Sequence, residues 1–304
     1  MSRERKSTLL RERLKKPGAL VGVGVFDALS ARIAELCGFE VVHHSGFGTA
    51  ATLLGAPDIG LLDFTEMCQR IKSIARAVSI PVLGDADTGY GNPLNVYRTV
   101  HEYIWAGSAG LFIEDQRWPK RCGHMEGKEI IGWDEMKGKL EAAIDAKREL
   151  DPDFVIIYRT DAVAVAGIEE AVARGNAAAA LGVDMVFVEA LESKEQMERA
   201  VREIDAPLML NLIEGGKTPL FSVREAESMG FKYIVFALTP LFSATKGMIE
   251  ALSHLKKTGS SKGLEEKLVS FDQFTDIVKL KDLLAMEKKY ASDTATGTMG
   301  NSTR

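Results

Sequence analysis

The sequence contains few cysteines, few aromatic residues and no long apolar run. Its 304 residues include three cysteines and only 7% aromatic residues. Cys37, Cys68 and Cys122 are odd in number and lack the spacing of a metal site, so we expect a reducing cytoplasm as their environment. No segment reaches the roughly 20 apolar residues that a membrane-spanning helix needs, and no signal peptide opens the chain. We therefore expect a cytoplasmic protein with no membrane partner.

Strong charge of either sign is also absent. The chain has 38 Lys and Arg against 43 Asp and Glu, a net charge of -5 and a pI near 5.7. This balance argues against binding to nucleic acid or to an acidic membrane. A basic cluster over residues 3–16 is interleaved with acids and predicts a solvated helix face. The 46% of hydrophobic residues is enough to bury a sizeable core.

Short apolar runs alternate with helical stretches along most of the chain. This order is typical of a parallel sheet with crossover helices. Eight such units predict an α/β protein with a (β/α)8 TIM barrel. A doubly wound sheet is the alternative, but Gly22-Val23-Gly24 lacks the third glycine of a dinucleotide-binding turn. The predicted strands cover residues 20–24, 41–44, 82–85, 110–115, 154–160, 185–189, 208–212 and 233–237.

The C-terminal quarter continues beyond the eighth strand. A helix is predicted from Pro240 to about Lys257, followed by a linker and two helical pieces that end near Tyr290. We assign residues 1–290 to a single barrel domain that includes this helical extension. Residues 291–304 are rich in Ser, Thr, Gly and Asn and are predicted to be a disordered tail.

Polar side chains follow most of the predicted strands, at the end where α/β barrels carry their chemistry. Asp85 and Asp87 form a hard-oxygen pair suited to Mg²⁺. Arg159 can clamp a carboxylate through two hydrogen bonds. The small residues 45–48 have amides suited to a carboxylate or phosphate oxygen. The remaining strand ends carry Glu114, Glu189 and Asn211.

One loop, residues 118–133, places a thiol among cations. Cys122 follows Lys120 and Arg121 and precedes Gly123 and His124, and these neighbours are expected to favour the thiolate. The thiol could exchange a proton with a bound molecule. Glycines in the loop would let it close and exclude water.

Each of these features also has a structural interpretation. A lone cysteine is often a small buried apolar residue, and a strand-terminal acid such as Asp161 is often only a helix N-cap. Arg159 could form a structural ion pair with Glu189 or Asp161. Their combination in one chain nevertheless favours a divalent-metal enzyme that acts on a small anionic substrate.

Several motifs resemble those of the isocitrate lyase/phosphoenolpyruvate mutase superfamily, across residues 8–290. The sequence Lys120-Arg121-Cys122-Gly123-His124 resembles the loop of its carbon–carbon lyase branch, which includes the methylisocitrate and 2,3-dimethylmalate lyases. Phosphonomutases of the superfamily carry a different loop without this cysteine. The other matching segments are 45–48, 55–58, 84–91, 114–116, 159–161, 189, 211 and 214–219.

The resemblance implies a barrel whose last helix is exchanged between subunits in a homotetramer. It also implies Mg²⁺, with Mn²⁺ as a substitute, at Asp85 and Asp87, joined through water by Asp58 and Glu114. Cys122 would be the general acid of a retro-aldol cleavage, with Arg159, Glu189 and His124 as further catalytic residues. A di- or tricarboxylate would be held by Ser45, Gly46, Phe47, Gly123, His124, Arg159, Asn211 and Lys246.

Within the branch, the substrate is predicted from two positions where methylisocitrate lyases carry arginines. This chain has Lys246 at the first and Phe271 at the second, which favours an alkyl group in place of the third carboxylate. The expected substrate is thus a 2-alkylmalate resembling 2,3-dimethylmalate, cleaved to a 2-oxo acid such as pyruvate and a monocarboxylate. The alternatives are 2-methylisocitrate lyase, oxaloacetate hydrolase and, with less support, a phosphonomutase. Pro240, where the hydrolases typically have a serine, favours a lyase. A third hypothesis, besides lyase and hydrolase, is a non-catalytic, thiol-regulated or scaffold protein that retains the barrel.

Overall fold

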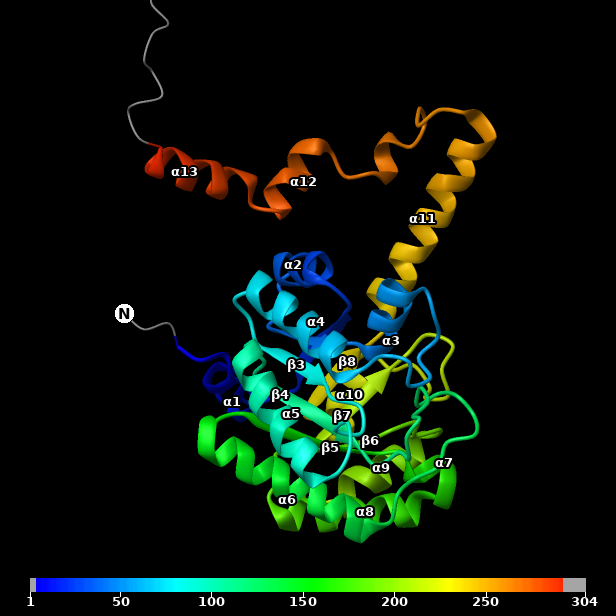
Figure 1. Cartoon of the computed structure of the whole chain (residues 1–304). Coiled ribbons are helices and arrows are strands. Elements are labelled where there is room, and N and C mark those ends of the chain that lie inside the picture. Colours follow the sequence, from blue (N-terminus) through cyan, green and yellow to red (C-terminus); the bar gives the residue numbers. More distant parts are fainter. Residues whose placement is uncertain (1–3, 292–304) are drawn as a thin grey trace, which may run out of the picture. The chain divides into compact units, whose positions relative to one another are not determined.

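The computed structural model describes residues 4–291 and contains a closed barrel of eight parallel strands. Each strand pairs with the next in the sequence, and β8 pairs with β1 to close the barrel (Figure 1). The predicted (β/α)8 barrel is confirmed, and each predicted strand end lies within one residue of the observed one. The strands are β1 (Leu20–Val25), β2 (Val41–His44), β3 (Val82–Asp85), β4 (Gly110–Glu114), β5 (Val155–Thr160), β6 (Met185–Val188), β7 (Leu208–Leu212) and β8 (Tyr233–Phe236).

Helices follow the strands and cover their outer faces. Helix α2 begins with a reciprocal capping box between Asp27 and Ser30, as the sequence predicts. Gly182 and Gly230 end their helices in the left-handed conformation, where glycine has no steric penalty. The outer helices are α2 (Ala28–Leu36), α4 (Phe64–Ala77), α5 (Pro93–Ala106), α6 (Trp133–Leu150), α7 (Ala162–Ala166), α8 (Ile168–Leu181), α9 (Lys194–Glu203) and α10 (Val223–Met229).

Helix α1 (Lys6–Lys15) packs at the N-terminal end of the barrel. Leu10 is fully buried and belongs to the same apolar cluster as Leu83 and Val155 inside the barrel. Arg11 pairs with Asp184 at 2.8 Å. The predicted solvated face describes one side of this segment, where Glu12, Lys15 and Lys16 are exposed, whereas the apolar side that carries Leu10 was not predicted. The barrel is closed at this end, so the opposite end carries its site.

A short helix after β2 was not predicted. Helix α3 (Gly46–Thr49) runs into a π-helical turn, η1 (Ala50–Leu54). Ser45 caps α3 by accepting a hydrogen bond from the amide of Gly48. Gly46 donates its amide to Asp85 on β3, and a Cβ atom at Gly46 would lie 2.5 Å from that carboxylate. This contact ties the turn after β2 to the acid at the end of β3.

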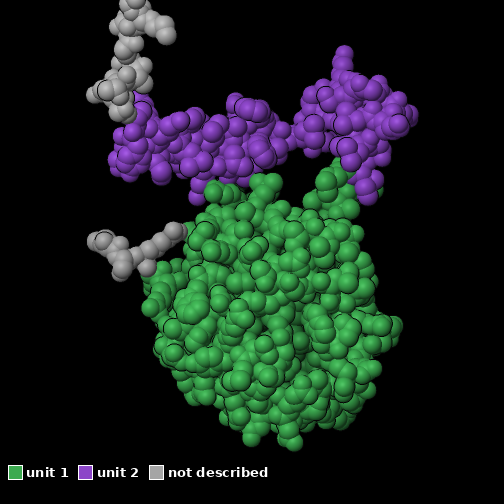
Figure 2. Space-filling model, viewed as in Figure 1, with its two compact units in different colours: residues 1–248 green, residues 249–304 purple. Residues whose placement is uncertain are grey.

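The chain divides into two compact units, residues 1–248 and residues 249–304 (Figure 2). Helix α11 (Thr239–Thr258) confirms the helix predicted after β8 and runs from the first unit into the second. The second unit also contains η2 (Glu265–Lys267), α12 (Phe271–Ile277) and α13 (Leu280–Tyr290). Almost all of the predicted tail, residues 292–304, lies outside the described residues. Within residues 4–291, no helix is long and apolar enough to cross a membrane.

Candidate active site

The acids predicted for a metal gather at the C-terminal end of β3 and β4. Asp85 ends β3 and accepts hydrogen bonds from the amides of Gly46 and Asp87, both at 3.0 Å. Asp87 follows in the left-handed region, with a φ of 46°. Burial and the charge of Asp87 raise the pKa of Asp85 to about 7. Burial also raises the pKa of Glu114 well above its usual range. Negative charge is thus crowded into a region of low polarity.

Lys120 provides the positive charge that faces these acids. Its Nζ lies 2.6 Å from Asp58 and 2.7 Å from Asp87, and its side chain is 4% exposed. Burial alone would lower the pKa of Lys120, but Asp87, Asp58, Asp85 and Glu114 together raise it well above the usual range. Lys120 is therefore a fixed cation. In the sequence, Lys120 is recognisable only as a neighbour of the thiol, and its pairing with the acids was not predicted.

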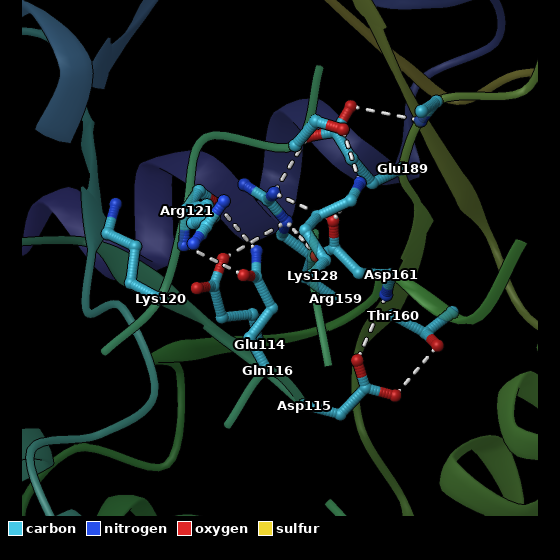
Figure 3. A network of polar contacts seen from close by, with 12 residues as sticks. Glu114, Asp115, Gln116, Lys120, Arg121, Lys128, Arg159, Thr160, Asp161 and Glu189 are labelled. Atoms are coloured by element: carbon cyan, nitrogen blue, oxygen red, sulfur yellow. Dashed lines mark hydrogen bonds and ion pairs between the residues drawn. The ribbon is translucent and has the colours of Figure 1, made fainter. Parts of the chain in front are cut away.

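Arg159, at the end of β5, is the centre of a second charge network (Figure 3). Its Nε lies 2.9 Å from Asp161 and 3.2 Å from Glu114, and one terminal nitrogen lies 3.1 Å from Glu189. The guanidinium also lies over the ring of Phe187. These carboxylates outweigh burial and raise the pKa of Arg159. The two ion pairs named as a structural alternative, with Asp161 and Glu189, are thus both present.

Glu189 follows β6 and connects Arg159 to the loop that carries Cys122. Burial would raise the pKa of Glu189, but Arg159 and His124 outweigh it and lower the value to about 2. His124 Nε2 lies 3.2 Å from Glu189, and His124 Nδ1 accepts the amide of Lys217 at 2.8 Å. Because Nδ1 is an acceptor, the proton of a neutral His124 ring is on Nε2, facing Glu189.

Residues 117–129 form a flap whose base is held by backbone pairing. Gln116 pairs with Ile130, and the amide of Arg117 donates to Glu129. The Gln116 side chain makes two hydrogen bonds to the backbone of Arg121. At the tip, a Cβ atom on Gly123 would lie 2.3 Å from Glu189 and 2.6 Å from Arg159. Only glycine can bring this part of the flap onto the network.

Cys122 lines the same cavity as Asp85, Arg159 and Glu189. Its amide donates to the carbonyl of Asp58 at 3.1 Å, which fixes the residue above the acids. Burial raises the pKa of the Cys122 thiol to about 11. The expectation that nearby cations favour a thiolate is therefore wrong, because burial outweighs them. A protonated thiol can act as a general acid.

Part of the cavity wall is apolar. Phe47 and Ile213 line it with other apolar residues from β4, β6 and the segment after β8, namely Phe112, Phe187, Ala237 and Leu238. His43, on β2, is stacked on Phe112 with ring centroids 4.7 Å apart. Burial lowers the pKa of His43 to about 3, so this histidine is neutral. His43 was not predicted as a site residue, although it lies near the end of a predicted strand.

The cavity is small in this conformation. Its volume is about 40 Å³, measured as the space open to the centres of water molecules, and one water needs roughly 10–15 Å³ on that measure. The flap is therefore closed over a space that is too small for a dicarboxylate. Movement of the flap, together with exchange of the ion pairs around Arg159, is needed before such a molecule can enter.

Most predicted site residues meet in this cavity. It is lined by Ser45, Gly46, Phe47, Asp58, Asp85, Cys122, Gly123, His124, Arg159, Glu189 and Asn211. Asp87 and Glu114 adjoin it through Lys120 and Arg159. Lys246 is exposed on α11 and is not part of the cavity wall formed by the described residues. Its predicted contact with a substrate stays a prediction.

The acid cluster has the right donors for a divalent cation. Six buried acids share the region with three buried bases, and Glu114 Oε1 is buried without a hydrogen-bond partner among residues 4–291. No three Asp, Glu, His or Cys side chains of the described chain converge tightly enough to chelate an ion by themselves. Mg²⁺ does not require such a cage, because it takes one or two carboxylates and keeps waters. The acids are Asp58, Asp85, Asp87, Glu114, Asp161 and Glu189, and the bases are Lys120, Lys128 and Arg159.

A barrel with acids, an arginine and a buried thiol under a closed flap is the arrangement expected of an enzyme that acts on small anionic molecules. Comparison with known proteins gives the family. The model of the phosphoenolpyruvate phosphomutase family matches residues 10–256. The chain therefore belongs to the phosphoenolpyruvate mutase/isocitrate lyase superfamily.

Three relatives illustrate the range of chemistry in this family. The chain is 40% identical to a 2,3-dimethylmalate lyase of Eubacterium barkeri, over 93% of this chain and 97% of the relative. A structure of oxaloacetate acetylhydrolase with 3,3-difluorooxalacetate has a TM-score of 0.89 at 36% identity, covering 97% and 98% of the two chains. Phosphonopyruvate hydrolase, solved with oxalate and Mg²⁺, has a TM-score of 0.85 at 27% identity, covering 94% and 99%.

Proposed function

We propose that this protein is a Mg²⁺-dependent lyase that cleaves a carbon–carbon bond of a 2-alkylmalate, releasing a 2-oxo acid such as pyruvate and a monocarboxylate. The observation that carries the proposal is the position of Cys122, whose protonated thiol shares one closed cavity with Asp85 and Arg159. A retro-aldol cleavage needs a general acid to protonate the released carbon and a cation to bind the substrate carboxylate, and Cys122 and Arg159 can supply these two groups.

Asp85 and Asp87 would hold the ion, joined through water by Asp58 and Glu114, and Mn²⁺ would substitute for Mg²⁺. When bound, the ion would supply Lewis-acid stabilisation of the negative charge on the substrate's hydroxyl oxygen as that oxygen loses its proton. When the carbon–carbon bond breaks, this oxygen becomes the carbonyl of the 2-oxo acid and the electron pair passes to the carbon of the monocarboxylate fragment. A metal complex of a relative, phosphonopyruvate hydrolase with oxalate and Mg²⁺, supports this assignment. The crowding that raises the pKa of Asp85 supports it too, since a cation would relieve that crowding.

The other groups would bind and orient the substrate. Arg159 would exchange a carboxylate partner for a substrate carboxylate, and the backbone at Ser45, Gly46 and Phe47 together with Asn211 would hold its oxygens. Glu189 would orient the substrate hydroxyl or accept its proton. Cys122 would then protonate the carbon released by the bond cleavage.

The choice of a 2-alkylmalate depends on the apolar wall. Phe47, Ile213 and Leu238 offer no partner for a third carboxylate, and a buried unpaired carboxylate is strongly unfavourable. An alkyl group suits this wall. The 40% identity to a 2,3-dimethylmalate lyase supports the same choice. Oxaloacetate hydrolysis is the second candidate, favoured by the similarity to oxaloacetate acetylhydrolase.

A substrate panel tests the proposal. Purified protein would be assayed with 2,3-dimethylmalate, 2-ethylmalate, 2-methylisocitrate and oxaloacetate, measuring 2-oxo acid and oxalate. We expect 2-oxo acid from an alkylmalate, and loss of that activity with EDTA and in Cys122→Ser. Cys37→Ser, at an exposed cysteine, is the matched control and should keep activity. Oxalate from oxaloacetate without cleavage of any malate would instead establish the hydrolase.

A further inference from the structure

A second cleft lies beside the flap and is separate from the active-site cavity. Its volume is about 620 Å³, within the usual range for small-molecule sites. The walls include Leu61, Phe64, Tyr90, Trp118 and Ile131, together with two acids, Asp63 and Glu135, and two bases, Arg117 and Lys139. None of the described residues that line this cleft also lines the cavity of Cys122. We call it the Lys139 cleft.

The Lys139 cleft exposes aromatic and aliphatic surface in a concave setting. Phe64 and Tyr90 meet edge to face, with ring centroids 5.4 Å apart. Leu61 is 54% exposed and Trp118 is 45% exposed, although both are large apolar side chains. A concave apolar wall that stays open to solvent gains free energy when an apolar body covers it.

Lys139 differs from the other buried lysines of the described chain. Lys120, Lys128 and Lys147 each have a carboxylate oxygen within 2.8 Å of Nζ. Lys139 is 4% exposed, yet no carboxylate of residues 4–291 lies within 4.0 Å of its Nζ. Its partner is the carbonyl of Thr88, at 3.1 Å. An ammonium has three donors, so two of them remain to be matched.

The charges around Lys139 indicate that its ammonium group lacks a close anionic partner. Burial lowers the pKa of Lys139, and exposed Glu135, one helical turn earlier, offsets this only in part. A buried charge is normally paired, and a carboxylate is the anion that pairs with the other three lysines. A ligand carboxylate at this point would complete the set.

We propose that the Lys139 cleft is a second, non-catalytic ligand site that binds a monocarboxylate with an aromatic or branched apolar body. The carboxylate pairs with Lys139, and the body lies against Phe64, Tyr90 and Trp118. Thr88 and Tyr90 belong to the turn that follows Asp85 and Asp87, and Trp118 lies at the start of the flap. The ligand therefore touches both the acid-bearing turn and the base of the flap.

Calorimetric titration of the full chain tests the proposal with two probes of one shape, 3-phenylpropanoate and 3-phenylpropan-1-ol. We expect the acid to bind at least about ten-fold more tightly than the alcohol, as a charge-assisted contact requires. Lys139→Met should remove this preference. Lys137→Met, at an exposed lysine of the same helix, is the matched control and should retain it. Binding of the acid in the active site would be unaffected by Lys139→Met, so the variant separates the two sites.

A second variant keeps the test decisive if Lys139→Met fails to fold. Leu61→Trp places a larger side chain at an exposed wall position and should abolish binding while circular dichroism stays unchanged. The proposal is overturned if 3-phenylpropanoate does not bind, if acid and alcohol bind equally, or if binding persists in both Lys139→Met and Leu61→Trp. A cleft covered by a second copy of the chain would give the first of these outcomes.

Discussion

At the scale of single residues, burial rather than neighbouring charge sets the protonation of the Cys122 thiol. Cys122 is surrounded by cations in the sequence, yet burial raises the pKa of its thiol to about 11. We therefore expect slow alkylation, because only the thiolate reacts quickly. At pH 8, iodoacetamide should modify exposed Cys37 well before Cys122, as followed by peptide mass spectrometry. Faster modification of Cys122 would contradict a buried, protonated thiol.

His43 gives a prediction about pH and stability. Burial lowers its pKa from 6.5 to about 3. Between these two pH values, His43 is therefore protonated in the unfolded chain but neutral in the folded chain. The free energy of unfolding should therefore fall as the pH drops from 6.5 toward 3. By pH 5 this histidine alone costs about 2 kcal/mol. Urea titrations at pH 7 and pH 5 should show a smaller loss in His43→Phe than in the unmodified protein.

The control for His43 is an exposed aromatic residue without an ionisable group. Trp105→Phe, on α5, removes no titratable group and should leave the loss between pH 7 and pH 5 unchanged. An equal loss in His43→Phe and in the unmodified protein would mean that His43 titrates normally. Phe is a suitable replacement because the imidazole stacks on the ring of Phe112.

The sequence predicted the members of the site better than their partners. Acids, arginine and thiol could be selected because each follows a recognisable strand or lies in a distinctive loop. The contacts between them depend on barrel register, which places Glu114 beside Arg159 and Arg159 beside Phe187. They also depend on flap closure, which brings His124 to Glu189. Neither is encoded in a local pattern, so the Lys120 pairs and His43 were missed.

At the scale of elements, the flap depends on one glycine. Gly123→Ala should leave the fold intact but keep the flap from closing, because the new methyl group would overlap Glu189 and Arg159. Misplacing reacting groups by about 1 Å can cost about 100-fold in rate, and we expect a loss of that order in kcat/KM. Gly132→Ala is the control, since a Cβ atom there meets nothing within 4 Å. Equal activity of both variants would show that close approach at Gly123 is unnecessary.

The strands were predictable because both of their faces are buried, which leaves continuous apolar runs in the sequence. Helix α3 was not, because Gly46-Phe47-Gly48 has poor helix propensity. Contacts from outside the segment hold it, notably the hydrogen bond from Gly46 to Asp85. Where local preference and tertiary contact disagree, a single sequence reports only the first.

At the scale of the whole molecule, the second unit exposes several large apolar side chains that a stable monomer would be expected to bury. Leu283, Leu284 and Tyr290 of α13 are 59%, 51% and 72% exposed. We propose that a second copy covers them in a homotetramer with exchanged C-terminal helices. Light scattering after size exclusion should give about four times the chain mass of 33.1 kDa. Leu283→Asp with Leu284→Asp should lower this mass, and a monomer of the unmodified protein would refute the assembly.

The packing of Leu10 beneath the barrel has a kinetic consequence. With that end filled by side chains, whatever enters under residues 117–129 must also leave there. In the proposed cleavage, the two fragments would leave in sequence, the one nearest the opening first and the one held at Asp85 last. The fragment that leaves last binds the same free form of the enzyme as the substrate does, so it should inhibit competitively with respect to substrate. The fragment that leaves first should not inhibit competitively.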